Sequence, residues 1–233
     1  MGGSSGKKLN KVSVESKPIT GDVTFHYFQV NYRGALIRAL LDYGKIKFTD
    51  KHYTMEEFPA VKVKFDYEQM PAIEINGKSM NQSAAISLYI ARSLGIMGCT
   101  MEQEYLIQAF LGSYQDFMGV MRPVFFPMSD DEKNKLEQSS SALLDTITKA
   151  SVVYEKYCKK LGGKYITGDS FTLADAIAGV LVRNLIMQPN RNEAYKQIFE
   201  KNAPTYLKYA NQAINNELKN HFENGTFVKE SPV

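Results

Sequence analysis

The sequence is poor in the residues that build metal sites and disulfides. It has two cysteines in 233 residues, Cys99 and Cys158, together with three histidines and no tryptophan. The cysteines are far apart and fit neither a disulfide framework nor a C-x-x-C site, and the histidines are equally scattered. We therefore expect no disulfide and no bound metal.

An excess of one charge and a long apolar run are also missing. The 28 basic and 25 acidic residues leave a net charge of +3, and their signs are mixed along the chain. This pattern lacks the electrostatic footprint of a nucleic-acid-binding protein. No apolar run approaches membrane-spanning length and no secretory signal pattern is present. We expect a globular, cytoplasmic protein without an integral membrane segment, large enough for one or two domains.

Residues 1–22 are rich in Gly, Ser and Lys and have little apolar periodicity, so we expect a flexible N-terminal extension. Met1-Gly2 resembles the start of an N-myristoylation signal, but that motif requires Ser or Thr at position 6, where Gly6 stands. A cloning remnant or a plain disordered tail fits this composition better than a lipidated end.

The most informative stretch covers residues 69–94. Within it, Ala72–Ile75 has the alternating apolar pattern of a short strand, and Asn76-Gly77 supplies the two positive-φ residues of a tight turn. The return strand begins at Lys78–Met80. Strands joined this tightly are antiparallel neighbours, so the sequence predicts a hairpin here.

Each end of this hairpin offers a group that can bind a ligand. Pro71 stands before the first strand, and a cis Met70–Pro71 bond would turn the backbone N–H and C=O of Met70 outward. After the hairpin, Gln82 and Ser83 precede a helix whose free N–H groups favour a carboxylate, with Ser83 as the expected N-cap. The pair suits a short peptide with a free carboxylate. The alternative is an ordinary hairpin packed on a capped helix.

The run M-P-A-I-E-I-N-G-K-S-M-N-Q-S-A-A-I-S-L-Y-I-A-R resembles the glutathione-binding half of the thioredoxin-like domain in cytosolic glutathione transferases. The Q-S-x-A-I form is closest to the sigma class, which includes the glutathione-dependent prostaglandin D synthases. The resemblance implies that Met70, before the cis Pro71, pairs with the cysteinyl backbone of glutathione. It also implies that Gln82 and Ser83 hold the γ-glutamyl carboxylate.

The preceding residues follow the order of elements in that family's first domain. The sequence predicts a strand over Val23–Val30, a helix over Ala35–Tyr43 and a second strand around Lys47–Tyr53, with a looser segment over residues 54–67. We therefore expect a thioredoxin-like, glutathione-binding α/β domain over residues 23–98.

Function in a thioredoxin-like domain lies where the first strand meets the first helix, and this corner has no cysteine. Disulfide chemistry and cysteine-type transferases are thereby excluded at the corner. In tyrosine-type transferases a Tyr at this place donates a hydrogen bond to the glutathione sulfur, and an Arg six positions later adds positive charge. Tyr27 and Arg33 match both places. The resemblance implies that they are catalytic, because only the thiolate attacks; the alternative is that Tyr27 merely packs.

The sequence departs from the family pattern at several positions. Where sigma-class proteins often carry W-P-x-x-K, this chain has Phe58 and Lys62 at the ends of the segment. Lys62 keeps the charge that meets the glycyl carboxylate, while Phe58 can only pack. Gln69 replaces the basic residue commonly found two before the cis-proline, and Tyr32 replaces a small residue before the arginine. We expect weaker glutathione capture and a more crowded corner.

The second half of the chain is predicted to be wholly helical. Apolar residues at three- and four-residue steps, Pro positions and capping signals predict helices over 101–126, 129–161, 173–187, 192–201 and 204–220. Thr172 and Asp175 form a capping-box pattern, within a segment that resembles the folding motif of the transferases' second domain. We expect an all-α domain over residues 99–222 and a loose tail over 223–233.

These observations and the resemblance predict a transferase that joins the glutathione thiolate to a small apolar electrophile, with glutathione as co-substrate. Phe28, Val30 and Met118 are the residues expected to line the electrophile pocket. Two alternatives stay open: a glutathione-dependent isomerase of the prostaglandin D synthase type, and a non-catalytic binding protein. The residues leave the physiological electrophile undetermined, because apolar pockets specify shape loosely.

The resemblance also implies a homodimer. In sigma-like proteins an Asp in a D-F-M segment reaches the amino group of glutathione bound by the other subunit, and Asp116 matches it. Metal-responsive prostaglandin D synthases carry further acidic residues just before this Asp, where this chain has Gly112 and Gln115. We therefore expect no dependence on Mg²⁺ or Ca²⁺, since both prefer carboxylate ligands.

Overall fold

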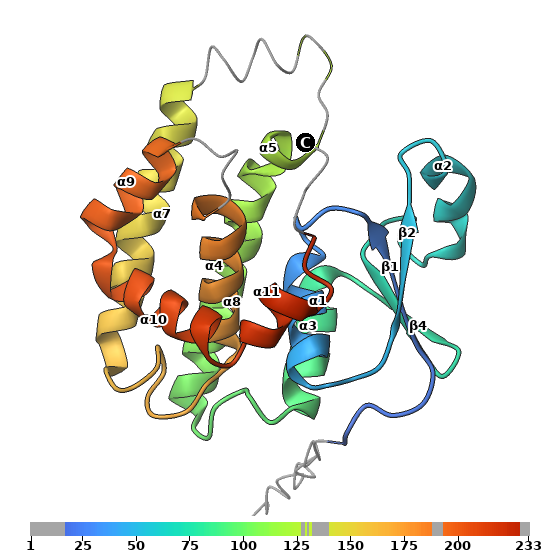
Figure 1. Cartoon of the computed structure of the whole chain (residues 1–233), viewed down its shortest axis with the longest axis horizontal. Coiled ribbons are helices and arrows are strands. Elements are labelled where there is room, and N and C mark those ends of the chain that lie inside the picture. The colour runs from blue at the N-terminus through green and yellow to red at the C-terminus, as the bar shows by residue number, and fades with distance from the viewer. Residues whose placement is uncertain (1–16, 127–128, 130, 132–139, 188–192, 229–233) are drawn as a thin grey trace, which may run out of the picture.

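The computed structural model describes residues 17–126, 129, 131, 140–187 and 193–228. They form an α/β part followed by a helical part, as Figure 1 shows, which confirms the predicted fold class. The sheet has the order β2-β1-β3-β4, with β1 parallel to β2 and the other pairs antiparallel. Its strands are β1 (Val23–Phe28), β2 (Thr49–Tyr53), β3 (Ala72–Ile75) and β4 (Lys78–Asn81).

Two helices lie between the sheet and the helical part, α1 (Ala35–Tyr43) and α3 (Ser83–Ser93), as Figure 1 shows. Seven of the nine residues of α1 are buried, so this helix is core on nearly every face. The short α2 (Phe58–Val61) lies away from the helical part, after β2, and leads into a 3-10 turn at Lys62–Lys64.

The hairpin follows from local chemistry. Asn76 and Gly77 have φ angles of 50° and 77°, which is the pair of left-handed residues that a tight two-residue hairpin turn requires. The Met70–Pro71 peptide bond is cis. Both features were predicted and both are confirmed. The Asn76 amide also accepts a hydrogen bond from the Asp22 N–H and so ties the turn to the start of β1.

The helical part surrounds α8, whose nine residues are all buried. A 2.9 Å hydrogen bond from the Thr172 N–H and another from its hydroxyl group reach Asp175, which confirms the predicted capping box. Among the described residues no helix is both long and apolar enough to cross a membrane. The helices are α4 (Met101–Val120), α5 (Arg122–Phe125), α7 (Ser140–Leu161), α8 (Leu173–Leu181), α9 (Glu193–Asn202), α10 (Pro204–Asn215) and α11 (Lys219–Asn224).

Several predicted boundaries are wrong. The helix predicted over 101–126 ends at Val120, and α5 begins two residues later with Pro123 in its first turn. Because proline has no N–H and clashes with the preceding turn, the break falls ahead of it. The helix predicted over 173–187 ends as a π-helical turn at Val182–Ile186, and the one over 204–220 divides after Asn215. Most of the first turns of the helix predicted from 129, residues 130 and 132–139, and residues 1–16 of the predicted N-terminal extension lie outside the described residues.

Asp175 joins α8 to the loop before it. Its carboxylate is fully buried and accepts hydrogen bonds from the Thr172 N–H, the Thr172 hydroxyl and the Ile166 N–H. Burial raises the pKa of Asp175 to about 6, against the three donors, which favour the charged form. The folded state therefore loses part of its stability when this group ionises.

We predict that Asp175→Ala lowers the free energy of unfolding by about 2–5 kcal/mol, because the N–H groups of Ile166 and Thr172 lose their buried acceptor. Urea unfolding curves measure this loss. Folding raises this pKa, so the stability difference between wild type and variant should grow as the pH is lowered from 7 toward 5. Asp169→Ala, on the exposed loop, is the control; an equal loss in both variants would contradict the assignment.

Candidate functional site

Tyr27 lies at the corner between β1 and α1, and only 2% of its surface is exposed. A Cβ atom on Gly34 would lie 2.4 Å from the Tyr27 ring, so glycine makes room for the tyrosine. Burial and the nearby Tyr32 raise the pKa of the Tyr27 hydroxyl well above its usual 10, although a hydrogen bond from the Arg33 backbone N–H opposes this. The hydroxyl therefore stays protonated near neutral pH and can donate a hydrogen bond.

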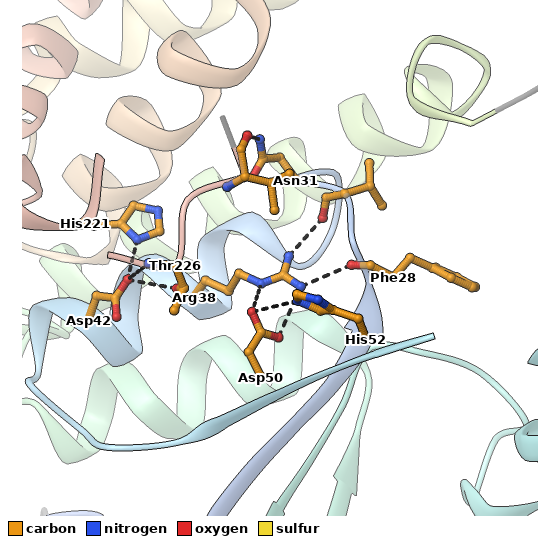
Figure 2. A network of polar contacts seen from close by, with 10 residues as sticks. Phe28, Asn31, Arg38, Asp42, Asp50, His52, His221 and Thr226 are labelled. Atoms are coloured by element: carbon orange, nitrogen blue, oxygen red, sulfur yellow. Dashed lines mark hydrogen bonds and ion pairs between the residues drawn. The ribbon is translucent and has the colours of Figure 1, made fainter. Parts of the chain in front are cut away.

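Arg38 of α1 forms hydrogen bonds with the backbone of the same corner, as Figure 2 shows. Its side chain has no exposed surface, and its guanidinium donates to the carbonyls of Val30 at 2.9 Å and Phe28 at 3.1 Å. The remaining donors reach the Asp50 carboxylate at 2.7 and 3.2 Å, and His52 lies 3.1 Å from the same carboxylate. Sequence reasoning missed Arg38. The available signal was the position of Arg38, the one cation among the apolar residues of the predicted helix Ala35–Tyr43, which indicates a buried charge that needs a partner.

The C-terminal segment is bound to the other end of α1 and to the corner. Asp42 accepts hydrogen bonds from His221 at 2.6 Å and from the Thr226 N–H and hydroxyl (Figure 2). Burial would raise the pKa of Asp42, but these donors outweigh it and lower the pKa. The Asn31 amide exchanges two hydrogen bonds with the backbone of Val228. The expectation of a loose tail is therefore wrong for the residues up to Val228; residues 229–233 lie outside the described chain.

A cavity of about 350 Å³ opens beside this corner. It brings together seven of the ten residues expected to bind glutathione, from the corner, α2, the cis-proline bend and the start of α3. The cavity is lined by Phe28, Arg33, Phe58, Gln69, Met70, Pro71, Gln82 and Ser83. One wall is therefore a backbone edge and another is a helix N-terminus, which are the two features expected from the sequence.

The start of α3 differs in detail from the expectation. The helix begins at Ser83 itself, and Gln82, with a φ of 71°, occupies the N-cap position without a side-chain capping bond. Ser83 is therefore not the N-cap. Its hydroxyl donates instead to Gln115 Oε1 of α4, at 3.1 Å. As a first-turn residue, Ser83 contributes a backbone N–H that has no partner within the helix and can meet an anion.

The other three expected glutathione ligands are not among the residues that line the cavity. Tyr27 is buried at the corner, and Asp116 is exposed on α4. Lys62 forms a 2.9 Å ion pair with Glu68, both of them substantially exposed. A ligand carboxylate would have to compete with Glu68 for this lysine.

A second cavity, of about 310 Å³, shares Phe28 with the first. It contains Phe28 and Val30, two of the three residues expected to line the electrophile pocket. Met118 does not line it; that side chain is buried in the core. The lining is Phe28, Gln29, Val30, His52, Tyr53, Thr54, Met55, Glu57, Phe125 and Phe126.

Tyr32 contacts both Met118 and two aromatic residues of the second cavity. The Tyr32 hydroxyl donates to the backbone carbonyl of Met118, and its ring packs against Phe125 and Phe126, with centroids 5.3 and 5.1 Å away. The tyrosine thus fills the space that a small residue would leave open between the corner and α4.

We predict that Arg38→Met lowers the free energy of unfolding by about 3–5 kcal/mol, because the Asp50 carboxylate is left without its buried cation. Denaturant unfolding measures the loss. The control is Arg92→Met, which removes a half-exposed ion pair with Glu104 and should cost at most about 1 kcal/mol. A similar small cost for both variants would show that Arg38 does not hold the corner.

Comparison with known proteins completes the description of the site. The family model "Glutathione S-transferase, N-terminal domain" matches residues 23–92, and the model of the corresponding C-terminal domain matches residues 117–217. Glutathione S-transferase 1 of Ascaris suum is 30% identical over 152 residues, which cover 65% of this chain and 74% of that protein. Hematopoietic prostaglandin D synthase of Gallus gallus is 29% identical over 150 residues, with 64% and 72% covered.

Solved structures show the same fold. A glutathione S-transferase of the hookworm Necator americanus, described as monomeric, superimposes with a TM-score of 0.73 and 24% identity. The match covers 87% of this chain and 97% of that one.

Proposed function

We propose that this chain, which belongs to the glutathione S-transferase family, joins the thiolate of glutathione to a small apolar electrophile. The 350 Å³ cavity carries the proposal, because it gathers a peptide edge, a helix N-terminus and Arg33 beside the buried Tyr27. In this proposal the domain over residues 23–98 binds glutathione, and the helical domain over 99–222 helps to enclose the electrophile.

The proposed chemistry is of the tyrosine type. A thiol with a pKa of about 8.5 is mostly protonated at neutral pH, so the protein must favour the thiolate. Tyr27, kept protonated by burial, donates a hydrogen bond to the sulfur, and the Arg33 guanidinium adds positive charge. Both effects favour the charged form of the bound thiol and lower its pKa.

Each part of glutathione has a proposed partner in or near the cavity. The cis Met70–Pro71 bond lies in the cavity wall, where the Met70 backbone can pair with the cysteinyl unit. The γ-glutamyl carboxylate binds at the start of α3, beside Gln82 and Ser83. At the glycyl end Lys62 exchanges Glu68 for the ligand carboxylate.

Phe58 and Gln69 also line the glutathione cavity. Neither side chain supplies a cation, so neither can form an ion pair with a carboxylate of glutathione. We therefore expect the affinity for glutathione to depend mainly on the backbone edge and on the start of α3.

The electrophile is proposed to bind in the second cavity, which shares Phe28 with the first. Aromatic and aliphatic side chains, including Val30, dominate its lining and suit an apolar molecule.

Two features support the sigma-like type of transferase. The Q-S-x-A-I motif includes Gln82 and Ser83 in the glutathione cavity, and the chain is similar to a prostaglandin D synthase. The same similarity keeps a glutathione-dependent isomerase as the second candidate. Retention of Tyr27 and Arg33 argues against a binding protein without catalysis. The proposed location is the cytoplasm, where thiols are kept reduced.

We predict that Tyr27→Phe slows conjugation of glutathione to a generic aromatic chloride by about 10- to 200-fold, since one hydrogen bond to the thiolate is lost. Absorbance follows both the product and the bound thiolate, whose pKa should rise. The control is Tyr67→Phe, which removes an exposed hydroxyl. Full activity and an unchanged thiolate band in Tyr27→Phe would mean that this tyrosine only packs.

We predict a homodimer in which Asp116 reaches the amino group of glutathione held by the other subunit. Asp116 is exposed on α4, so a partner can contact it. Asp116→Ala should raise the KM for glutathione, while Glu102→Ala, exposed on the same helix, should not. Sedimentation measures the assembly, and a fully active monomer would disprove the cross-subunit role.

We also predict that Mg²⁺ and Ca²⁺ leave the rate of conjugation unchanged. Several-fold activation by either ion would refute that expectation.

A further inference from the structure

Gln115 connects the two functional ends of the glutathione cavity. It lies on α4, in the helical part, and is half-buried. Its side-chain oxygen, Oε1, accepts a hydrogen bond from Arg33 Nη1 and a second one, at 3.1 Å, from the Ser83 hydroxyl. One amide therefore touches the residue proposed to stabilise the thiolate and the residue proposed to bind the carboxylate.

Donor and acceptor rules fix how this amide is oriented. A guanidinium has five N–H donors and no acceptor, so Gln115 must present its oxygen to Arg33. The same oxygen can only accept from Ser83. Because a hydroxyl group has a single proton, the proton of Ser83 is already used by Gln115 before any ligand arrives.

This arrangement conflicts with carboxylate binding and so couples the two ends. The ligand carboxylate also only accepts hydrogen bonds, and besides the Ser83 backbone N–H it competes for the Ser83 hydroxyl proton that Gln115 holds. When Ser83 turns to the ligand, Gln115 Oε1 is left to Arg33 alone. Two hydrogen bonds to one oxygen weaken each other, so loss of the bond from Ser83 strengthens the bond from Arg33 to Gln115.

We propose that Gln115 is a positioning residue that couples capture of the glutathione carboxylate at Ser83 to anchoring of Arg33 beside the sulfur. The inference rests on the proposed function. A neutral amide suits the role: it holds Arg33 without cancelling the guanidinium charge, and it releases Ser83 to a charged ligand. A carboxylate at this position would hold both donors more firmly and repel the ligand.

Two substitutions of similar size separate these effects. Gln115→Glu should weaken glutathione binding by about tenfold or more and raise the pKa of the bound thiol, because the new charge repels the carboxylate and neutralises Arg33. Gln115→Leu should leave the Kd unchanged or lower it up to about threefold, because Ser83 is free, while kcat falls about tenfold as Arg33 loses its anchor. Calorimetry gives the Kd, and thiolate absorbance against pH gives the pKa.

Controls distinguish coupling from a structural effect. Gln108→Glu places the same charge on an exposed part of α4 and should change neither quantity. Gln115→Met provides the same comparison as Gln115→Leu if that variant does not fold. In the Gln115→Leu background, Ser83→Ala should weaken binding by a larger factor than in the wild type.

Three results would each overturn the coupling. The first is an equal loss of glutathione affinity in Gln115→Glu and Gln115→Leu, and the second is an unchanged affinity and thiol pKa in both variants. The third is an identical effect of Ser83→Ala in the wild-type and Gln115→Leu backgrounds. A wild-type protein that neither binds glutathione nor lowers its thiol pKa would overturn the proposed function as well. The wild type is measured first, so the two failures are distinguishable.

Discussion

The site depends on one buried cation. Arg38 has no exposed surface, yet its guanidinium is satisfied by the Asp50 carboxylate and by the carbonyls of Phe28 and Val30. A buried charge is tolerated only when it is paired and hydrogen-bonded in this way. In return it fixes the path of the backbone immediately after Tyr27. The corner between β1 and α1 is therefore shaped by an electrostatic requirement of the core.

The corner between β1 and α1 also determines where the two cavities lie relative to each other, because its residues line both of them. Phe28 follows Tyr27 directly and forms part of both cavities, so the thiol and the electrophile would meet across one ring. On the glutathione side the wall is made of backbone: the cis bond before Pro71 and the first turn of α3. Backbone groups can form hydrogen bonds with the backbone and carboxylate of a peptide, whereas the apolar cavity requires few particular polar groups of its ligand. This division suits an enzyme with one fixed co-substrate and a variable second one.

Contacts from the helical part complete the corner. Tyr32 reaches the carbonyl of Met118, and Gln115 reaches Arg33, so α4 is bonded to the loop at two places. The C-terminal segment adds a third tie through Asn31. The loop between β1 and α1 is thus held by residues from both parts of the chain, although the residues that line the 350 Å³ cavity all come from the α/β part.

What the sequence determined was local. The Asn76-Gly77 turn, the cis-proline bend and the Thr172 capping box were predicted correctly, because each depends on conformational preferences of adjacent residues. The family resemblance added most of the residues that line the 350 Å³ cavity. These features need no knowledge of the distant chain.

Only the tertiary structure decided the partners of the polar side chains. Ser83, expected to cap α3, donates across 32 residues to Gln115, and Lys62 is paired with Glu68. The two contacts of the end of the chain, at Asp42 and Asn31, were equally invisible. A polar group takes whichever partner packing brings within about 3 Å, and that distance is set by how the helices and the sheet pack, which neighbouring residues do not encode.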